Sequence, residues 1–420
     1  MQLITLLFAL LVSFCVFAQD PPGELLVPVA DQELTIVRHP AQGTHLAIWL
    51  MPGLGEPTRM LETAAKISGL GVEVWLVDLA ESLFLIKGPQ TMRTIDGKYV
   101  SGLIAAAHAR TGKTITMIGR GYSAIPTLRG IQHWQQAQQN SGEAATYLSG
   151  AILFSPELYA TVPALGLEPV YEPIVDATNV PIILYQAEKG GNRWQLGKLL
   201  SRLEKGGATV YVQVMPGVTG LFYDDDESPA TLNALKRVPA QIVRGLDLLD
   251  KTPTPGHALP LADKVAALTS GLDSELTAFH GNPSPPPIDL VDAKGQYLSR
   301  DDYRGKVTLV NFWATWCGPC VEEIPSLNNL REQMAGESFE LISVNYAEGT
   351  EQVQKFMGQV KVDFPVLLDE DGTESAKWNV LVFPSTFVIG PNGQIVYGVN
   401  GAIHWDAPEV VNQLRALLTP

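Results

Sequence analysis

The chain has 420 residues, and at roughly 150 residues per domain this length predicts two or three domains. Hydrophobic residues make up 46% of the chain and charged residues 17%, which excludes a disordered, collagen-like or coiled-coil protein. The net charge of −15 argues against nucleic-acid binding, because a nucleic-acid-binding surface needs clustered Lys and Arg. The three cysteines, Cys15, Cys317 and Cys320, are too few for a disulfide-stapled scaffold or a four-cysteine zinc site.

The first 18 residues form an apolar run that is typical of a signal peptide. Val16 and Ala18 occupy the −3 and −1 positions of a signal-peptidase site. We therefore expect cleavage after Ala18 and export to the periplasm. The run lacks a Lys or Arg near its start, so an uncleaved membrane anchor is the alternative, although the run is somewhat short for a spanning helix.

Residues 44–250 alternate strand-like and helical segments, a pattern that predicts a parallel sheet with helices on both faces. The expected strands are 44–51, 72–79, 114–119, 149–154, 181–186 and 208–215, and the expected helices are 56–68, 100–111, the segment after Gly121, and 194–205.

Two segments in this region resemble those of α/β-hydrolases. Residues 51–55 (MPGLG) follow an early strand, as an oxyanion loop does, and residues 118–124 (IGRGYSA) lie at the strand-to-helix turn where a G-x-S-x-G motif would stand. Over about 200 residues, the outline therefore resembles an α/β-hydrolase.

The catalytic side chains of such a hydrolase are incomplete. Gly121 occupies the nucleophile position, and Ser123 follows two residues later. Thr219 and Gly220 stand where a catalytic His is expected, whereas Glu188 is an available acid. Because Ser-His-acid hydrolysis needs three groups, we expect a noncatalytic domain. A serine hydrolase that uses Ser123 is the alternative.

Two Pro-rich segments, 251–260 and 281–287, separate the two halves of the chain. Between them, residues 261–279 carry apolar side chains at helical spacing, which predicts a short bridging helix. The expected organisation is a signal peptide at 1–18, a hydrolase-like domain at 19–250, a linker with a helix at 251–287 and a second domain at 288–420.

The second domain carries a Cys-x-x-Cys motif between a strand and a helix. Residues 307–312 (VTLVNF) read as a buried strand, and residues 321–334 show helical periodicity. At a helix N-terminus, free N–H groups and the helix dipole favour a thiolate, which lowers a cysteine pKa from about 8.5 toward about 7. Cys317 is then the expected nucleophile, and Cys320, one turn later, would resolve the mixed disulfide.

Two further residues fall where this chemistry would use them. Pro384 interrupts the strand-like run 380–390, which favours an edge, a bulge or a cis Phe383–Pro384 bond. Glu323 lies one helical turn beyond Cys320 and is a candidate proton donor or acceptor. For the cysteines, the alternatives are a structural disulfide or a metal site. Glu323 could instead be a solvated helix residue, and Pro384 a trans proline at a sheet edge.

The segments FWATWCGPCVEEIPSL, 292–306 and FPSTFVIGPNGQIV together resemble the TlpA and ResA-like thiol-disulfide oxidoreductases, which have the thioredoxin fold. The resemblance covers about 130 residues, roughly a third of the chain. It implies Cys317 as the attacking cysteine, Cys320 as the resolving cysteine, Glu323 as the active-site acid and Pro384 as the cis-proline. Asn311 stands where cytoplasmic thioredoxins place a buried Asp.

We therefore expect an α/β chain in which a hydrolase-like parallel-sheet domain precedes a thioredoxin-fold domain. The expected activity is thiol-disulfide exchange. Gly and Pro separate the cysteines, as they do in reducing thioredoxins, which favours the reduction of client disulfides. The expected partners are a disulfide-containing client protein and a membrane thiol electron donor, with no cofactor, metal or nucleic acid. The alternative is a redox-sensing adaptor whose first domain carries the main function.

Overall fold

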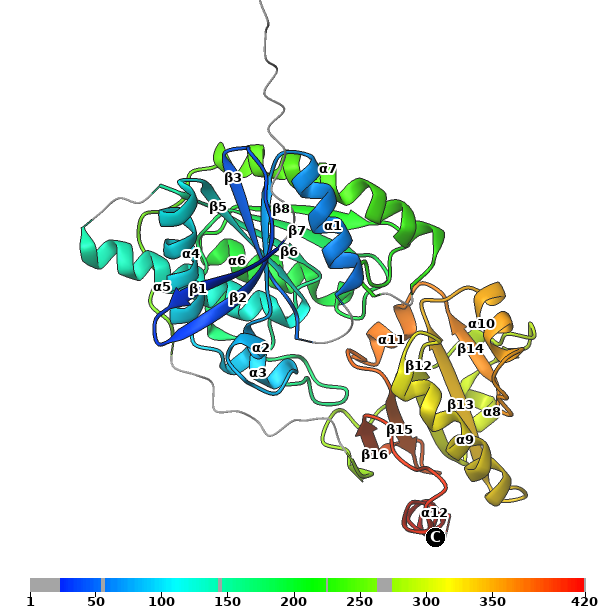
Figure 1. Cartoon of the computed structure of the whole chain (residues 1–420). Coiled ribbons are helices and arrows are strands. Elements are labelled where there is room, and N and C mark those ends of the chain that lie inside the picture. Colours follow the sequence, from blue (N-terminus) through cyan, green and yellow to red (C-terminus); the bar gives the residue numbers. More distant parts are fainter. Residues whose placement is uncertain (1–22, 54–56, 143–145, 224–225, 263–273, 419–420) are drawn as a thin grey trace, which may run out of the picture.

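The computed structural model describes residues 23–53, 57–142, 146–223, 226–262 and 274–418, which form two α/β domains lying side by side (Figure 1). The predicted signal peptide lies outside these residues. So does most of the predicted helix at 261–279, and within that range Thr277–Ala278 forms a strand instead. Within the described residues, no helix is long and apolar enough to cross a bilayer.

The first domain contains an eight-stranded sheet in the order β1-β2-β4-β3-β5-β6-β7-β8. Strands β3 to β8 run parallel to one another, as the alternating pattern predicts. A hairpin of β1 and β2 adds an antiparallel edge that the sequence analysis did not anticipate. The strands are β1 (Gly23–Val29), β2 (Gln32–His39), β3 (His45–Leu50), β4 (Glu73–Val77), β5 (Thr114–Arg120), β6 (Leu148–Phe154), β7 (Ile182–Ala187) and β8 (Val210–Met215).

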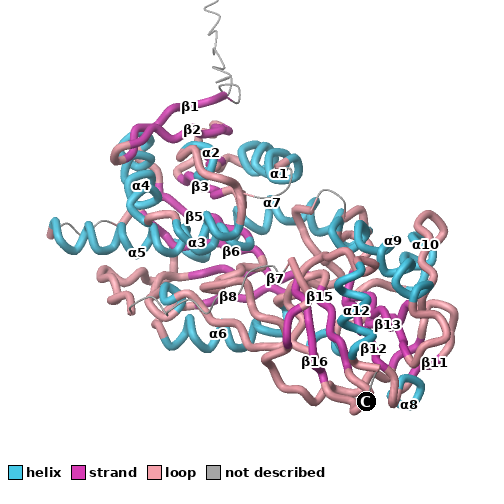
Figure 2. Tube along the Cα trace, turned by 90° about the horizontal axis from the view of Figure 1, so that it is seen from below, coloured by secondary structure: helices cyan, strands magenta, loops and turns pink. Residues whose placement is uncertain are grey.

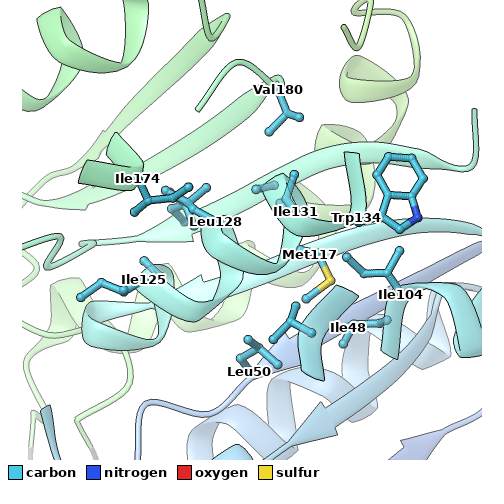
Figure 3. Close-up of a cluster of buried hydrophobic side chains, with 14 of the residues drawn as sticks. Ile48, Leu50, Ile104, Met117, Ile125, Leu128, Ile131, Trp134, Ile174 and Val180 are labelled. Carbon is cyan, nitrogen blue, oxygen red and sulfur yellow. The ribbon is translucent and has the colours of Figure 1, made fainter. Parts of the chain in front are cut away.

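Helices cover both faces of this sheet because each has one apolar stripe. Figure 3 shows part of one buried cluster, which includes Ile125 and Leu128 of α5 and Ile48 and Met117 of the sheet. Helices α1 and α7 pack on the opposite face through a second cluster. The helices are α1 (Thr58–Gly69), α2 (Leu79–Ser82), α3 (Pro89–Thr94), α4 (Gly97–Thr111), α5 (Ala124–Ser141), α6 (Leu196–Lys205) and α7 (Pro229–Asp250).

The second domain has a six-stranded sheet in the order β14-β13-β12-β15-β16-β9. Strands β12 to β14 are parallel, whereas β15 and β16 are antiparallel to their neighbours. Strand β9 comes from the predicted linker and pairs with β16, so this domain begins before residue 288. The strands are β9 (Thr277–Ala278), β12 (Val307–Trp313), β13 (Phe339–Tyr346), β14 (Val366–Asp369), β15 (Ser385–Ile389) and β16 (Ile395–Asn400).

Shorter elements complete the second domain. A small ribbon of β10 (Leu290–Val291) and β11 (Tyr297–Leu298) precedes α8 (Arg300–Tyr303). Helix α9 (Gly318–Gln333) follows β12 directly, as the sequence predicts. The remaining helices are α10 (Thr350–Met357), α11 (Thr373–Lys377) and α12 (Pro408–Ala416). The strand expected at 380–390 begins only at Ser385, because Pro384 has no N–H to donate to the ladder.

The two domains contact each other through the loops that follow β6 and β7. Leu165 of the loop after β6 packs against Gly398 of β16, where an added Cβ would lie 2.3 Å from Leu165 Cδ2, so only glycine permits the approach. Asn400 Nδ2 donates to the carbonyl of Pro163 at 2.8 Å, and Lys189 Nζ donates to the carbonyl of Ala347 at 2.7 Å. Both views in Figures 1 and 2 place the second domain against the first along this side.

Candidate functional site: a dithiol facing the first domain

Cys317 and Cys320 lie at the start of α9 and form a disulfide. Cys317 is the N-cap residue of the helix, and its sulfur accepts a hydrogen bond from the Cys320 N–H at 3.3 Å. The strand-to-helix placement predicted from the sequence is therefore confirmed. Because the first-turn N–H groups of a helix have no partner within the helix, they favour negative charge on the sulfur of the reduced state.

Both sulfurs are largely shielded from solvent. Cys317 is 6% exposed and Cys320 is 1% exposed. Trp313 is buried beneath the motif, and its Nε1 donates to Ser343 Oγ at 2.9 Å. Trp316, directly before Cys317, stacks on Tyr223 of the first domain with ring centroids 6.3 Å apart. The first domain therefore covers part of the dithiol.

Glu323 lies inside the domain below the cysteines. Its side chain is 3% exposed, which rules out the alternative of a solvated helix residue. Glu323 Oε1 accepts from Asn311 Nδ2 at 2.8 Å, and Oε2 accepts from Trp405 Nε1 at 3.0 Å. Burial raises the pKa of Glu323 to about 7, against the lowering effect of these two donors and of the Ile403 backbone. A carboxyl group with such a pKa is able to exchange a proton near neutral pH.

The Phe383–Pro384 peptide bond is cis, as the sequence analysis expected. The Phe383 ring contacts the edge of Trp316 with centroids 5.9 Å apart, so the proline loop lies beside the cysteines. Ser385 Oγ donates to Asn400 Oδ1 at 2.8 Å. Since Asn400 also binds the Pro163 carbonyl, the proline loop is connected to the first domain.

Sequence reasoning missed Glu348, which holds the segment before the cysteines. This side chain is 2% exposed. Its Oε2 accepts from the Thr315 N–H at 2.7 Å and from Asn345 Nδ2 at 2.8 Å. Burial raises the pKa of Glu348. The residue lies 28 positions beyond Cys320, and no local motif in the sequence connects it to the dithiol. Trp405, the partner of Glu323, was missed for the same reason.

The candidate hydrolase residues do not assemble a nucleophile. Ser123 is 0% exposed; its hydroxyl accepts from the Arg120 N–H at 2.9 Å and lies within 3.0 Å of the Leu50 and Arg120 carbonyls. It therefore stabilises the turn between β5 and α5. Gly121 occupies this turn with a φ of 51°, and Glu188 Oε2 accepts from the Gly217 N–H at 2.8 Å.

The second domain matches a known protein family and several curated proteins. The Redoxin family matches residues 274–414. The thiol-disulfide oxidoreductase ResA of Bacillus subtilis is 36% identical over 118 residues, covering 28% of this chain and 66% of that protein. ResA of Geobacillus kaustophilus is 34% identical over 130 residues, covering 31% of this chain and 75% of that protein.

Among solved structures, a thioredoxin-family thiol:disulfide interchange protein from Chlorobium tepidum is 25% identical; the match covers 32% of this chain and 99% of that one, with a TM-score of 0.29. The sequence matches and the disulfide at the start of α9 together identify the activity of the second domain. Through this thioredoxin-fold domain, the chain belongs to the Redoxin family and is a thioredoxin-like thiol-disulfide oxidoreductase related to the ResA proteins.

Proposed function

We propose that this protein is an exported disulfide reductase whose first domain is a noncatalytic relative of the α/β-hydrolases. The observation that carries the proposal is the Cys317–Cys320 disulfide at the N-terminus of α9 with a buried carboxyl group beneath it. The apolar run at residues 1–18 supports export.

In the proposed reaction, the Cys317 thiolate attacks one sulfur of a substrate disulfide and expels the other as a thiolate. Cys320 then attacks the Cys317 sulfur, which restores the internal disulfide and releases the second substrate thiol. Glu323 exchanges the proton of the resolving thiol, because its pKa of about 7 lies near the working pH. Pro384 lies in the loop that would present a backbone edge to the substrate.

Reduction consumes the two electrons of the dithiol, so an exported reductase needs a donor that returns them. A membrane protein that passes thiol electrons across the bilayer is the proposed source, and a disulfide-containing protein is the proposed client. Both proposals follow from the ResA-like family of the second domain.

The equilibrium reduction potential of the Cys317–Cys320 couple tests the direction of electron flow. We expect a value near or below about −250 mV for the full chain, measured against a dithiothreitol or glutathione buffer. A value between about −120 and −180 mV would instead indicate an oxidant or an isomerase, and the proposed direction would be wrong.

The noncatalytic assignment of the first domain is supported by the turn after β5. Gly121 contributes no side chain there, and the Ser123 hydroxyl is engaged with backbone groups. We expect Ser123→Ala to leave any ester turnover of the full chain unchanged in an assay with a chromogenic ester. Turnover that disappears in the variant would support the serine hydrolase instead.

A redox-sensing adaptor is the rival function, and thiol reactivity separates it from a reductase. A reductase requires that reduced Cys317 react faster than free cysteine with an alkylating reagent at about pH 6–7. A rate equal to that of free cysteine would favour the adaptor.

A further inference from the structure

A cavity of about 700 Å³ lies between the two domains, with Cys317 in its wall. The second domain contributes Trp316, Cys317, Pro319 and the 381–383 segment to its lining. This volume falls within the range of about 300–1,000 Å³ that is common for small-molecule sites. Cys317 therefore faces a partly open cleft between the domains rather than a flat surface.

The first domain contributes the carboxyl ends of its parallel strands to this cavity. Lining residues lie at or after the ends of β5, β6, β7 and β8, and they include Arg120, Glu157, Asn192 and Thr219. In α/β sheets, ligands bind in the crevice beyond the carboxyl ends of the strands. The cavity thus occupies the position in the first domain where a ligand site is expected.

Two positions that the hydrolase resemblance singled out line this cavity. Gly121 and Thr219, which stand in the nucleophile and His positions, both line it. A Cβ on Gly121 would lie 3.6 Å from Glu157 Oε1, so the carboxyl group of Glu157 borders the empty position. Glu157 is hydrogen bonded to Tyr122, and burial raises the pKa of Glu157.

Arg120 places a positive charge in the cavity wall, next to the aromatic side chains that border Cys317. Its guanidinium lies 4.8 Å from the centroid of the Tyr223 ring, and Tyr223 stacks on Trp316, the neighbour of Cys317. Arg120 and Glu157 are the charged side chains among the described lining residues, and the buried Arg93 lies behind Glu157 and Tyr122. The two lining charges therefore balance, and Arg93 adds a further positive charge behind the cavity wall.

A folded protein surface has little access to the attacking sulfur. Cys317 is 6% exposed in the two-domain arrangement. The hydrogen bonds from Lys189 to Ala347 and from Asn400 to Pro163 hold the domains together beside the cavity. A small disulfide that fits the cavity reaches the sulfur without separating the domains.

We infer that the interdomain cavity is a substrate site for a low-molecular-weight disulfide that carries carboxylate groups. Arg120 binds a carboxylate of the substrate, and the stacked rings of Tyr223 and Trp316 pack against the substrate beside Cys317. The inference rests on the proposed function and narrows its substrate class. Attack by Cys317 forms a mixed disulfide and expels one substrate thiolate; attack by Cys320 on Cys317 expels the other. Two electrons pass to the substrate, and each thiolate takes a proton from water or Glu323.

The test uses the reduced full chain and two small disulfides of opposite charge. Oxidised glutathione carries carboxylates, whereas cystamine carries only amines, and the change in tryptophan fluorescence on oxidation would report each second-order rate constant. Because a charged hydrogen bond is worth about 1.5–3 kcal/mol, Arg120→Ala should lower the rate with oxidised glutathione about tenfold more than the rate with cystamine. Arg110→Ala, which removes an exposed arginine of α4, serves as the matched control and should leave both rates as in the wild type.

A second variant tests the wall independently. Tyr223 is 45% exposed, so Tyr223→Ala should fold, which circular dichroism would check. The variant opens the cavity, and we expect the ratio of the rate with oxidised glutathione to the rate with insulin disulfides to fall at least about fivefold. A ratio equal to that of the wild type in Tyr223→Ala, or an equal loss for both small disulfides in Arg120→Ala, would overturn the substrate class. A wild-type protein that reduces none of the three disulfides would instead refute the proposed reductase.

Discussion

Glu323→Gln is the substitution that most directly tests the buried acid. Glu323 is 3% exposed, and its carboxyl group accepts hydrogen bonds from the side chains of Asn311 and Trp405 and from the backbone of Ile403. Burial raises the pKa of Glu323 from 4.5 to about 7, since a charged group loses its hydration inside the domain. Glutamine has nearly the same shape and cannot ionise, so the variant removes the titration while it keeps the packing.

The magnitude follows from the difference between the folded and unfolded pKa values. Each pKa unit corresponds to about 1.4 kcal/mol, so ionising Glu323 in the folded state costs about 3 kcal/mol of unfolding free energy. Because the folded pKa is raised, the stabilising contribution is fully present below about pH 4.5 and is lost as the pH rises through about 7. Relative to the glutamine variant, the wild type should therefore lose about 3 kcal/mol between pH 4.5 and pH 8.5.

Two measurements on the oxidised full chain check this expectation. Infrared difference spectra between wild type and variant should contain one protonated carboxyl band that titrates near pH 7. Urea unfolding at both pH values, followed through amide exchange in α9, should show the shift in the second domain. A band that titrates near pH 4.5, or a difference between wild type and variant that does not change with pH, would refute the argument that burial controls this group.

Three further predictions concern the same domain. Cys320→Ser removes the resolving thiol and should accumulate a mixed disulfide with the substrate, which mass spectrometry of the intact chain would detect; release at the wild-type rate would contradict the assigned roles. Trp405→Phe removes one donor to the Glu323 carboxylate and should raise the pKa of Glu323 further, so the infrared titration should move to higher pH rather than stay in place. Glu348→Ala should cost about 1–3 kcal/mol in urea unfolding, because it leaves buried donors without a partner. The exposed Glu351→Ala is its control, and equal midpoints for the two variants would count against a positioning role for Glu348.

Local sequence patterns were sufficient wherever a feature depends on neighbouring residues. The apolar run at 307–312 and the helical periodicity after it predicted β12 and α9, because strand and helix periods are properties of the segment itself. The position of Cys317 at the start of α9 followed from the same pattern. Alternation of strands and helices likewise predicted the parallel part of the first sheet.

Features that join distant segments required the tertiary structure. The sequence made Glu323 a candidate acid and left a solvated helix residue as the alternative. Only the packing of α9 against Trp405, 82 positions away, decides that it is buried with a raised pKa. The strand expected from residue 380 starts after Pro384, and the predicted linker supplies β9, because pairing partners are chosen by the whole sheet.

The sequence alone determined the chemistry of this protein, since a dithiol at the start of a helix is encoded within a few consecutive residues. The tertiary structure decided which side chains of the first domain surround the dithiol. Arg120, Tyr223 and Trp316 lie far apart in the chain, and they form one wall only because the carboxyl ends of the first sheet meet the dithiol across the domain boundary. Contacts of this kind depend on how two folded domains pack, and no local pattern encodes that packing.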